Sequence, residues 1–595
     1  MPYVALLPLM GLLGVVFVYD SRLPADWLGG QRELPADWLG WQREWLYHAC
    51  WVSVAWLLLV GIVRPQWLRL FPRILAGTLI ALGGVEALWG LCQLFGLCPS
   101  RHALFPMTGS FFNPGPYSGY LALVLPVAVF EALRLGQKQS PVHWAAGSVA
   151  LLILCVLPGG MSRASWLAAG VSLAFVMFRC TEGKRHTAFF VVCREHRRML
   201  VGVLCLLLCL VAVGIYLLKK DSADGRLLIW KVAMKEVVAH PGGAEMDAGS
   251  TFSAVYGNAQ ERYYTAGDYT DAEARVAASP EFAFNDYIQF ALMEGVWCPV
   301  LLLLIGILAF RGATLSGEVG LGAALLSLGV FAFFSYPLQL PAFVCTFFLL
   351  VVASFLAWAG PKVGRCAGRS WPIVAVPFLM YILFTSSVYS SLHGITHEET
   401  LQWTKARQYY RVGAYREAME AYRKVKGMDA CADYHFELGR ACYKSGEYLP
   451  AKWELDKALC LSGDPMILNL LAQSAWKAGY PFMAEAYLQR AAHRVPSLTY
   501  PYYLLTKLYA DPYFYQPDRL QEAARMVLER EPKVFSPAIA QMREEVRDIL
   551  KEIQTSALTP VDRDSIRRDI PYMIESVTLV PVGPGEGGDS LTLKQ

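Results

Sequence analysis

One mostly polar stretch separates two blocks of apolar segments in this chain. It opens with Gly225-Arg226-Leu227-Leu228-Ile229-Trp230-Lys231 and closes with Ala283-Phe284-Asn285-Asp286-Tyr287-Ile288-Gln289. A second arginine stands upstream, in Met161-Ser162-Arg163-Ala164-Ser165-Trp166, at the edge of an apolar segment. Because an arginine at membrane level is costly to keep, two of them beside one polar loop indicate a site for an anionic, membrane-borne substrate.

The apolar segments predict an all-α membrane domain. Hydrophobic residues make up 55% of the 595 residues, more than an ordinary soluble protein carries. A helix needs about 20 apolar residues to cross the hydrocarbon core of a bilayer. Runs of this length predict about 11 transmembrane helices, near residues 3–19, 45–63, 74–96, 116–134, 143–158, 165–178, 199–218, 287–310, 320–336, 340–358 and 372–389.

Lysine and arginine collect in alternate loops, which predicts the orientation of the chain. Basic loops follow the segments that end near residues 63, 134, 178, 310 and 358. By the positive-inside rule these loops face the cytoplasm. The N-terminus is then cytoplasmic, whereas the 219–286 loop and everything after residue 389 lie outside. Most of the net charge of +4 belongs to the cytoplasmic loops, so it gives no reason to expect a nucleic-acid partner.

The fourteen cysteines are scattered along the chain. They form no C-x-x-C pair and no His/Cys cluster, so the sequence predicts no metal site. Cys431, Cys442 and Cys460 lie in the part predicted to be outside. A disulfide could form among them, but the sequence does not say which would pair.

A repeat of thirty-three residues defines a C-terminal domain, predicted over 395–555. Glycine recurs at this step, and so do a small residue and an apolar residue after it, at Gly413, Gly446 and Gly479, at Ala418, Ala451 and Ala484, and at Tyr422, Leu455 and Leu488. Each unit predicts a helix, a turn at the glycine and a second helix. The pattern resembles tetratricopeptide repeats, which stack into a solenoid with a concave binding face. Residues 1–390 form the predicted membrane domain, and 556–595, rich in Pro and Gly, the predicted flexible tail.

Four motifs in the first half of the chain resemble the O-antigen ligase/polymerase superfamily. They are Thr108-Gly109-Ser110-Phe111-Phe112-Asn113-Pro114-Gly115-Pro116-Tyr117, Ser162-Arg163-x-x-Trp166, Arg226-x-x-x-Trp230 with His240-Pro241, and Asn285-Asp286-Tyr287-x-Gln289. The resemblance covers roughly residues 74–310. It implies a C-type glycosyltransferase: a polytopic membrane enzyme that uses a polyprenyl-diphosphate-linked sugar on the periplasmic face.

The chemistry of that donor assigns a role to the two arginines. Breaking a sugar–phosphate bond leaves negative charge on a diphosphate, which a metal ion or fixed cations must stabilise. The sequence shows no convincing carboxylate cluster for a metal. Arg163 and Arg226 are therefore the predicted diphosphate clamp, since a guanidinium offers phosphate a rigid fork of donors. Arg226 is also predicted to begin an amphipathic helix, whose N-terminus would add positive charge. The alternatives are that Arg163 anchors the interface and Arg226 is solvated.

The family pattern fails at one position. The family reads His-[Asn/Ser/Gln], nine residues, then Gly-x-x-Gly, and the His is its proposed base. This chain has Phe284-Asn285, nine residues, then Gly295-Val296-Trp297-Cys298. A phenylalanine takes no proton, so Asp286 or Glu294 is the predicted substitute, with Asn285 and Asp286 orienting the acceptor. The alternative is that Asp286 caps a helix starting at Tyr287, and a reaction without a base, or an inactive protein, also stays open.

These observations predict an enzyme of the bacterial inner membrane, with its large loop and repeats in the periplasm. It would need neither metal nor cofactor and would take a lipid-linked glycan as donor. The acceptor is a glycan, lipid A-core or protein, and the sequence does not choose among ligase, polymerase and protein O-oligosaccharyltransferase. The repeats offer a face to a protein partner. A flippase for lipid-linked glycan and a non-catalytic assembly scaffold are the alternatives.

Overall fold

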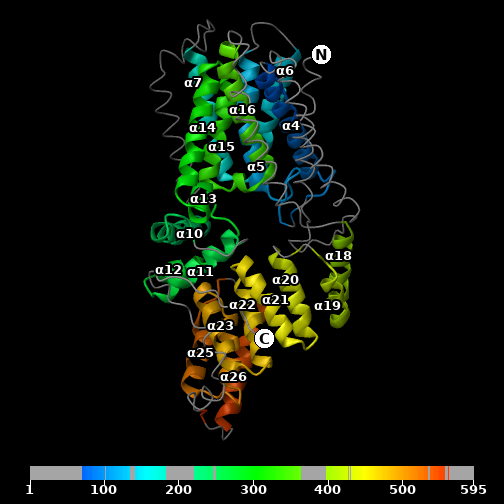
Figure 1. Cartoon of the computed structure of the whole chain (residues 1–595), viewed down its shortest axis with the longest axis vertical. Helices are drawn as coiled ribbons and strands as arrows, with labels where there is room; N and C mark the ends of the chain where they lie inside the picture. Colours follow the sequence, from blue (N-terminus) through cyan, green and yellow to red (C-terminus); the bar gives the residue numbers. More distant parts are fainter. Residues whose placement is uncertain are drawn as a thin grey trace. The chain divides into compact units, whose positions relative to one another are not determined.

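The computed structural model describes residues 70–100, 102, 104–134, 141–182, 220–244, 250–363, 397–426, 428, 431–533, 536–555 and 560–561 (Figure 1). The secondary structure of these residues is helical, with no strand among them, which confirms the predicted all-α class. They form two compact units. One comprises the described parts of 1–259, 278–434 and 460–463, and the other those of 260–277, 435–459 and 464–595.

The first unit holds a bundle of apolar helices. Neighbouring members pack side by side, as Figure 1 shows for α4, α5, α7, α14, α15 and α16. The members are α4 (Phe71–Leu94), α5 (Pro114–Arg134), α6 (Pro141–Val156), η3 (Leu157–Gly160), α7 (Arg163–Glu182), α14 (Trp297–Leu315), α15 (Val319–Phe334), η4 (Pro337–Gln339) and α16 (Pro341–Val363).

Four helical segments of the described part are long and apolar enough to cross a membrane: Phe71–Leu94, Pro114–Arg134, Pro141–Gly160 and Trp297–Leu315. Val319–Phe334 and Ala342–Trp358 are shorter apolar helices. The segments predicted near 3–19, 45–63, 199–218 and 372–389 lie outside the described residues, as does the predicted tail apart from Pro560 and Val561.

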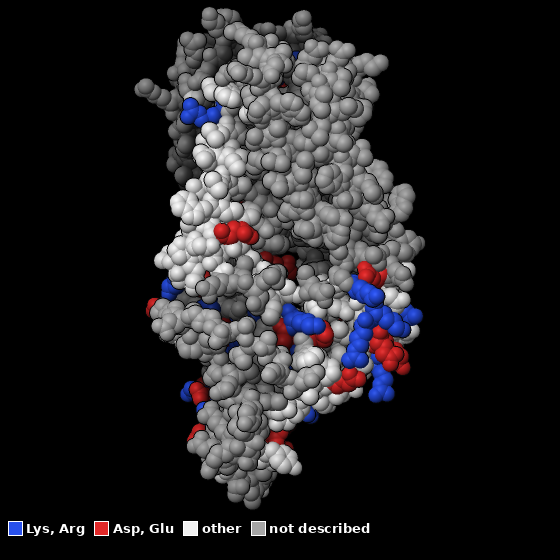
Figure 2. All heavy atoms as spheres, viewed as in Figure 1, with Lys and Arg blue, Asp and Glu red and all other residues white. Residues whose placement is uncertain are grey.

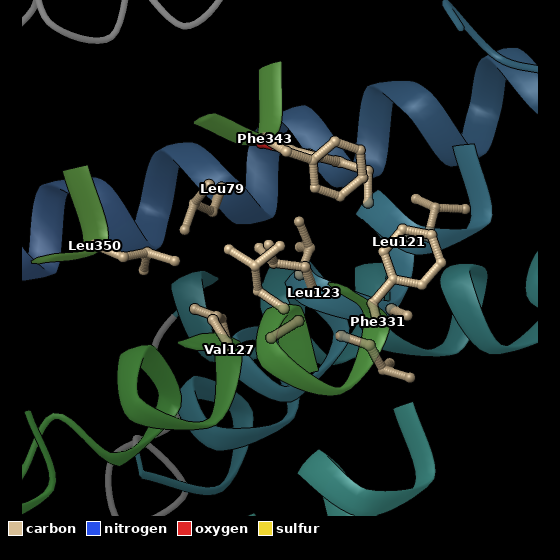
Figure 3. Close-up of a cluster of buried hydrophobic side chains, with 14 of the residues drawn as sticks. Leu79, Leu121, Leu123, Val127, Phe331, Phe343 and Leu350 are labelled. Carbon is tan, nitrogen blue, oxygen red and sulfur yellow. The ribbon is translucent and has the colours of Figure 1, made fainter. Parts of the chain in front are cut away.

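Helix α5 lies at the centre of the bundle, in contact with α4, α6, α7 and α15. Side chains from α4, α5, α15 and α16 meet there, and Figure 3 labels Leu79, Leu121, Leu123, Val127, Phe331, Phe343 and Leu350. Gly119 allows α5 and α15 to approach closely, since a Cβ at this position would lie 2.2 Å from the ring of Phe331. A helix buried on every side is typical of the core of a membrane bundle.

The apolar run predicted near 287–310 is not one span. It is divided into α13 (Asp286–Glu294) and α14 (Trp297–Leu315). The break falls at Gly295, whose φ is +90°, a backbone angle that residues with a side chain rarely adopt. The polar loop before it contains α10 (Lys220–Ala239), α11 (Phe252–Thr265) and α12 (Asp271–Val276).

The C-terminal helices follow one another in pairs. They are α18 (His397–Arg411) and α19 (Tyr415–Arg423), α20 (Ala432–Lys444) and α21 (Tyr448–Leu461), α22 (Pro465–Lys477) and α23 (Pro481–Arg494), α24 (Tyr500–Tyr509) and α25 (Pro517–Glu529), and then α26 (Pro537–Thr555). Charged side chains of both signs cover α18 and α19 in Figure 2, as on a solvated surface.

The repeated glycines end the first helix of three pairs. Gly413, Gly446 and Gly479 have φ of +81°, +85° and +89°. At Gly446, its own N–H bonds to the carbonyl of Tyr443 and the next N–H to that of Cys442, and the other two turns repeat this Schellman pattern. The alanines five residues later are buried in all three pairs. The thirty-three-residue repeat in the sequence therefore corresponds to a turn and a buried alanine that recur in each of the three pairs.

Candidate functional site

Arg226 lies on the inward edge of α10. Ile229 and Ala233, three and seven residues later, are buried on the same side, whereas Lys231 and Lys235 are exposed. This amphipathic pattern turns the Arg226 side chain toward the bundle. The helix runs from Lys220, so Arg226 lies within it, and the prediction that Arg226 begins the helix is wrong.

Two contacts hold the half-buried guanidinium of Arg226. Its Nη1 donates a hydrogen bond of 3.0 Å to the carbonyl oxygen of Phe334, at the end of α15. Its central carbon lies 4.7 Å from the ring centroid of Phe284. A ring face attracts a cation through its quadrupole. Arg226 is thus fixed between a carbonyl on one helix and an aromatic ring on the segment before α13.

Arg163 is the first residue of α7. Met161 precedes it in the left-handed region, with φ of +49°, and the Ser165 hydroxyl donates to that of Ser162 at 2.7 Å. Burial, and after it the positive charge of Arg163, lower the pKa of Arg226. Arg163 therefore lies within electrostatic range of Arg226, and the positive end of a helix accompanies Arg163 rather than Arg226.

The backbone of Phe284 is strained. Its φ is +52°, a region that residues other than glycine, asparagine and aspartate rarely enter. Its ring meets that of Tyr336 edge-on, with centroids 5.5 Å apart, and Tyr336 stacks on Phe282 at 4.2 Å. Strain of this kind costs about 1–3 kcal/mol and is concentrated at functional sites.

Asn285 is a helix cap. Its side-chain oxygen accepts a 3.1 Å hydrogen bond from the N–H of Ile288, and only 1% of the residue is exposed. The helix begins at Asp286, so the alternative in which Asp286 caps a helix starting at Tyr287 is wrong. Capping α13 is therefore the observed role of Asn285. Its predicted role in orienting an acceptor stays a prediction.

Asp286 is buried, with 0% exposure, and both carboxylate oxygens accept hydrogen bonds. Oδ2 takes the N–H of Leu338 at 2.8 Å, and Oδ1 takes the side-chain amide of Gln339 at 3.1 Å. Burial raises the pKa of Asp286 to about 7, against the opposing effect of the two hydrogen bonds. That value suits a general base, but the contacts tie the group to η4.

Glu294 lies at the opposite end of α13 from Asp286 and is exposed. The helix has nine residues, which puts the two backbones about 12 Å apart at 1.5 Å per residue. The structure thus brings Phe284 onto Arg226, with Arg163 within electrostatic range and Asp286 two residues after Phe284, and does not bring Glu294 to them.

A backbone clasp joins the end of α10 to the break before α14. The N–H of Ala244 donates to the carbonyl of Leu292 at 2.9 Å, and the N–H of Val296 donates to that of Pro241 at 3.0 Å. A Cβ on Gly295 would lie 2.8 Å from the carbonyl atoms of Gly242. A glycine is therefore required at residue 295, where two backbones cross.

The motif before α5 is held by two side chains of α4. The Gln93 side-chain oxygen accepts the N–H groups of Thr108 and Gly109 at 2.8 and 2.7 Å, and Glu86 accepts that of Ser110 at 3.0 Å. A Cβ on Gly109 would lie 2.4 Å from the ring of Tyr117. These contacts fix the Thr108–Ser110 loop on the bundle.

Three groups around Arg226 were not predicted from the sequence: Tyr336, Phe282 and the carbonyl of Phe334. The available signal was the aromatic run Phe333-Phe334-Ser335-Tyr336, followed at once by Pro337. A proline directly after such a run ends the helix and turns its last carbonyls away from regular bonding. One of those carbonyls is the acceptor of Arg226.

No family model, no curated protein and no solved structure matches this chain.

Proposed function

We propose that this protein is a bacterial inner-membrane glycosyltransferase that moves a glycan from a polyprenyl diphosphate to a periplasmic acceptor. The observation that carries the proposal is the half-buried guanidinium of Arg226, held by the Phe334 carbonyl and the Phe284 ring, with Arg163 of α7 within electrostatic range. A multiply charged anion would offset the cost of burying Arg226 and its repulsion by Arg163.

The chemistry follows from that pair. The acceptor hydroxyl attacks the anomeric carbon, the bond from that carbon to the phosphate oxygen breaks, and the electron pair leaves with the diphosphate, whose phosphate oxygens take up the proton that the hydroxyl releases. Arg163 and Arg226 would hold the diphosphate oxygens and stabilise the charge that develops on them. Arg226 is already held by Phe334 and Phe284, so little reorganisation would accompany the reaction. The reaction would need no metal.

The helix pairs after residue 397 would form a tetratricopeptide-like solenoid in the periplasm. Support comes from the repeated glycine turns and the buried alanines that follow them. In this proposal the N-terminus is cytoplasmic, about 11 helices cross the membrane, and the repeats bind a partner protein or the acceptor. Loss of residues 400–560 without loss of glycan product would refute the recruiting role.

The lipid-linked glycan pool of a deletion strain tests the function. Full-length glycan accumulating on the carrier would identify a ligase or protein O-oligosaccharyltransferase, because the final transfer is then lost. Single repeat units accumulating with short surface chains would identify a polymerase. A donor that is made but confined to the cytoplasmic leaflet would identify a flippase, and an unchanged pool would contradict the proposal.

A further inference from the structure

Asp286 and η4 form a bracket behind Arg226. The segment from Ser335 to Leu340 joins α15 to α16, and Pro337 within it has no N–H to donate. Within it, the N–H of Gln339 donates to the carbonyl of Tyr336 at 3.2 Å and that of Leu340 to the carbonyl of Pro337 at 2.9 Å, while the Leu340 carbonyl accepts the N–H groups of Phe343 and Val344 at 3.1 Å. The hydrogen bonds that Asp286 accepts from Leu338 and Gln339 tie the middle of this segment to the start of α13.

The bracket sets both contacts of Arg226. On one side, Asp286 follows Phe284 by two residues, and the ring of Phe284 lies under the guanidinium. On the other side, Leu338 follows Phe334 by four residues, and the Phe334 carbonyl accepts from the guanidinium. Tyr336 lies between Phe334 and Leu338 in the sequence, and its ring packs on that of Phe284. A change in the Asp286 bonds would thus shift the ring and the carbonyl relative to each other.

We infer that Asp286 is a positioning residue, which holds Arg226 in its diphosphate-binding geometry through η4, rather than the base that activates the acceptor. This inference rests on the proposed function, because it names what fixes one half of the proposed anion site. It accounts for a carboxylate that is wholly buried and engaged at both oxygens. A base must be within hydrogen-bond reach of the acceptor hydroxyl, whereas both oxygens of Asp286 accept hydrogen bonds from Leu338 and Gln339.

Asp286→Asn separates the two roles. Asparagine keeps one oxygen for the N–H of Leu338 and places an NH₂ toward Gln339, whose amide can turn over and present its own oxygen. The bracket survives this exchange, whereas a base does not. Gln339→Glu sets a second carboxylate against Asp286 and should break the bracket. Combined with Asp286→Asn, the carboxylate introduced by Gln339→Glu would accept from the new NH₂, so the double variant should regain what Gln339→Glu lost.

The test measures binding of a polyprenyl diphosphate that lacks a glycan to the full chain in lipid nanodiscs. Arg226→Ala should weaken binding by about 100-fold, and Asp286→Ala by at least about 10-fold. Asp286→Asn should recover most of the Asp286→Ala loss, and Asp286→Ala should add nothing in the Arg226→Ala background. If Asp286→Ala does not fold, Gln339→Glu alone and Gln339→Glu combined with Asp286→Asn give the same comparison.

The outcomes distinguish the inference from the function on which it rests. Wild-type binding no tighter than that of Arg226→Ala would overturn the proposed function. Arg-dependent binding that Asp286→Ala leaves intact would overturn the positioning role alone. Glycan transfer abolished by Asp286→Asn, with diphosphate binding retained, would restore Asp286 as the base.

Discussion

Replacing Gly295 with alanine should destabilise the protein by about 2–6 kcal/mol. Its backbone angles, φ +90° and ψ 164°, belong to a region nearly reserved for glycine, and a side chain there costs about 1–3 kcal/mol. The new Cβ would also lie 2.8 Å from the backbone carbon and oxygen of Gly242. Overpacking of this kind costs about 1–3 kcal/mol more. Gly242 cannot easily retreat, because Pro241 and Ala244 are hydrogen-bonded to the chain around Gly295.

Thermal unfolding of the purified full chain in detergent would measure this effect. Gly306→Ala is a matched control on the adjacent helix α14, because a Cβ at Gly306 meets no atom within 4 Å. Alanine favours a helix interior over glycine by about 1 kcal/mol, so this control should melt no lower than the wild type. Equal melting of Gly295→Ala and Gly306→Ala would refute the account of the backbone crossing.

Three further predictions concern other parts of the chain. Glu261→Ala should lower the free energy of unfolding by about 3–5 kcal/mol, because it removes the carboxylate that pairs with Arg490 at 2.7 Å and with the buried Arg494 at 3.1 Å. A loss under about 1 kcal/mol in thermal unfolding would contradict this prediction. Gly446→Ala should cost about 1 kcal/mol from backbone strain alone, because its Cβ would meet open space, and an unchanged melting temperature would contradict it. Burial raises the pKa of Asp286 from 3.8 to about 7, so the folded state binds this proton more tightly than the unfolded state does. The free energy of unfolding of the wild type should therefore fall as the pH rises from about 4 to about 7. Asp286→Asn should remove up to about 4 kcal/mol of that fall, and identical pH profiles of the two proteins would contradict the prediction.

The local features that could be predicted from the sequence are those that one residue type or one periodicity decides. Runs of apolar residues predicted the bundle helices that the structure describes. The thirty-three-residue step predicted the turns, because only glycine adopts positive φ without strain. The choice of Arg226 over Lys231 and Lys235 also follows from helical spacing, since the lysines lie on the exposed side of α10.

The features that could not be predicted depend on contacts between distant segments. The mostly apolar run near 287–310 hid the division at Gly295, because the backbone of Pro241–Ala244 that requires it lies far away in sequence. Asp286 looked like a helix cap or a base, since nothing local announces its bonds to Leu338 and Gln339. Pro337 indicates that the last carbonyls of α15 lack regular partners, but the sequence does not say that the Phe334 carbonyl accepts from Arg226, because that contact joins segments over one hundred residues apart.

The most direct test of the central claim is the lipid-linked glycan pool of a deletion strain that expresses Arg163→Ala, Arg226→Ala or Lys235→Ala at equal protein levels. Lys235 is the matched control, an exposed cation on the same helix as Arg226. Both arginine variants should accumulate donor as the empty deletion strain does, whereas Lys235→Ala should restore the wild-type pool. A wild-type pool with Arg226→Ala would contradict the diphosphate site.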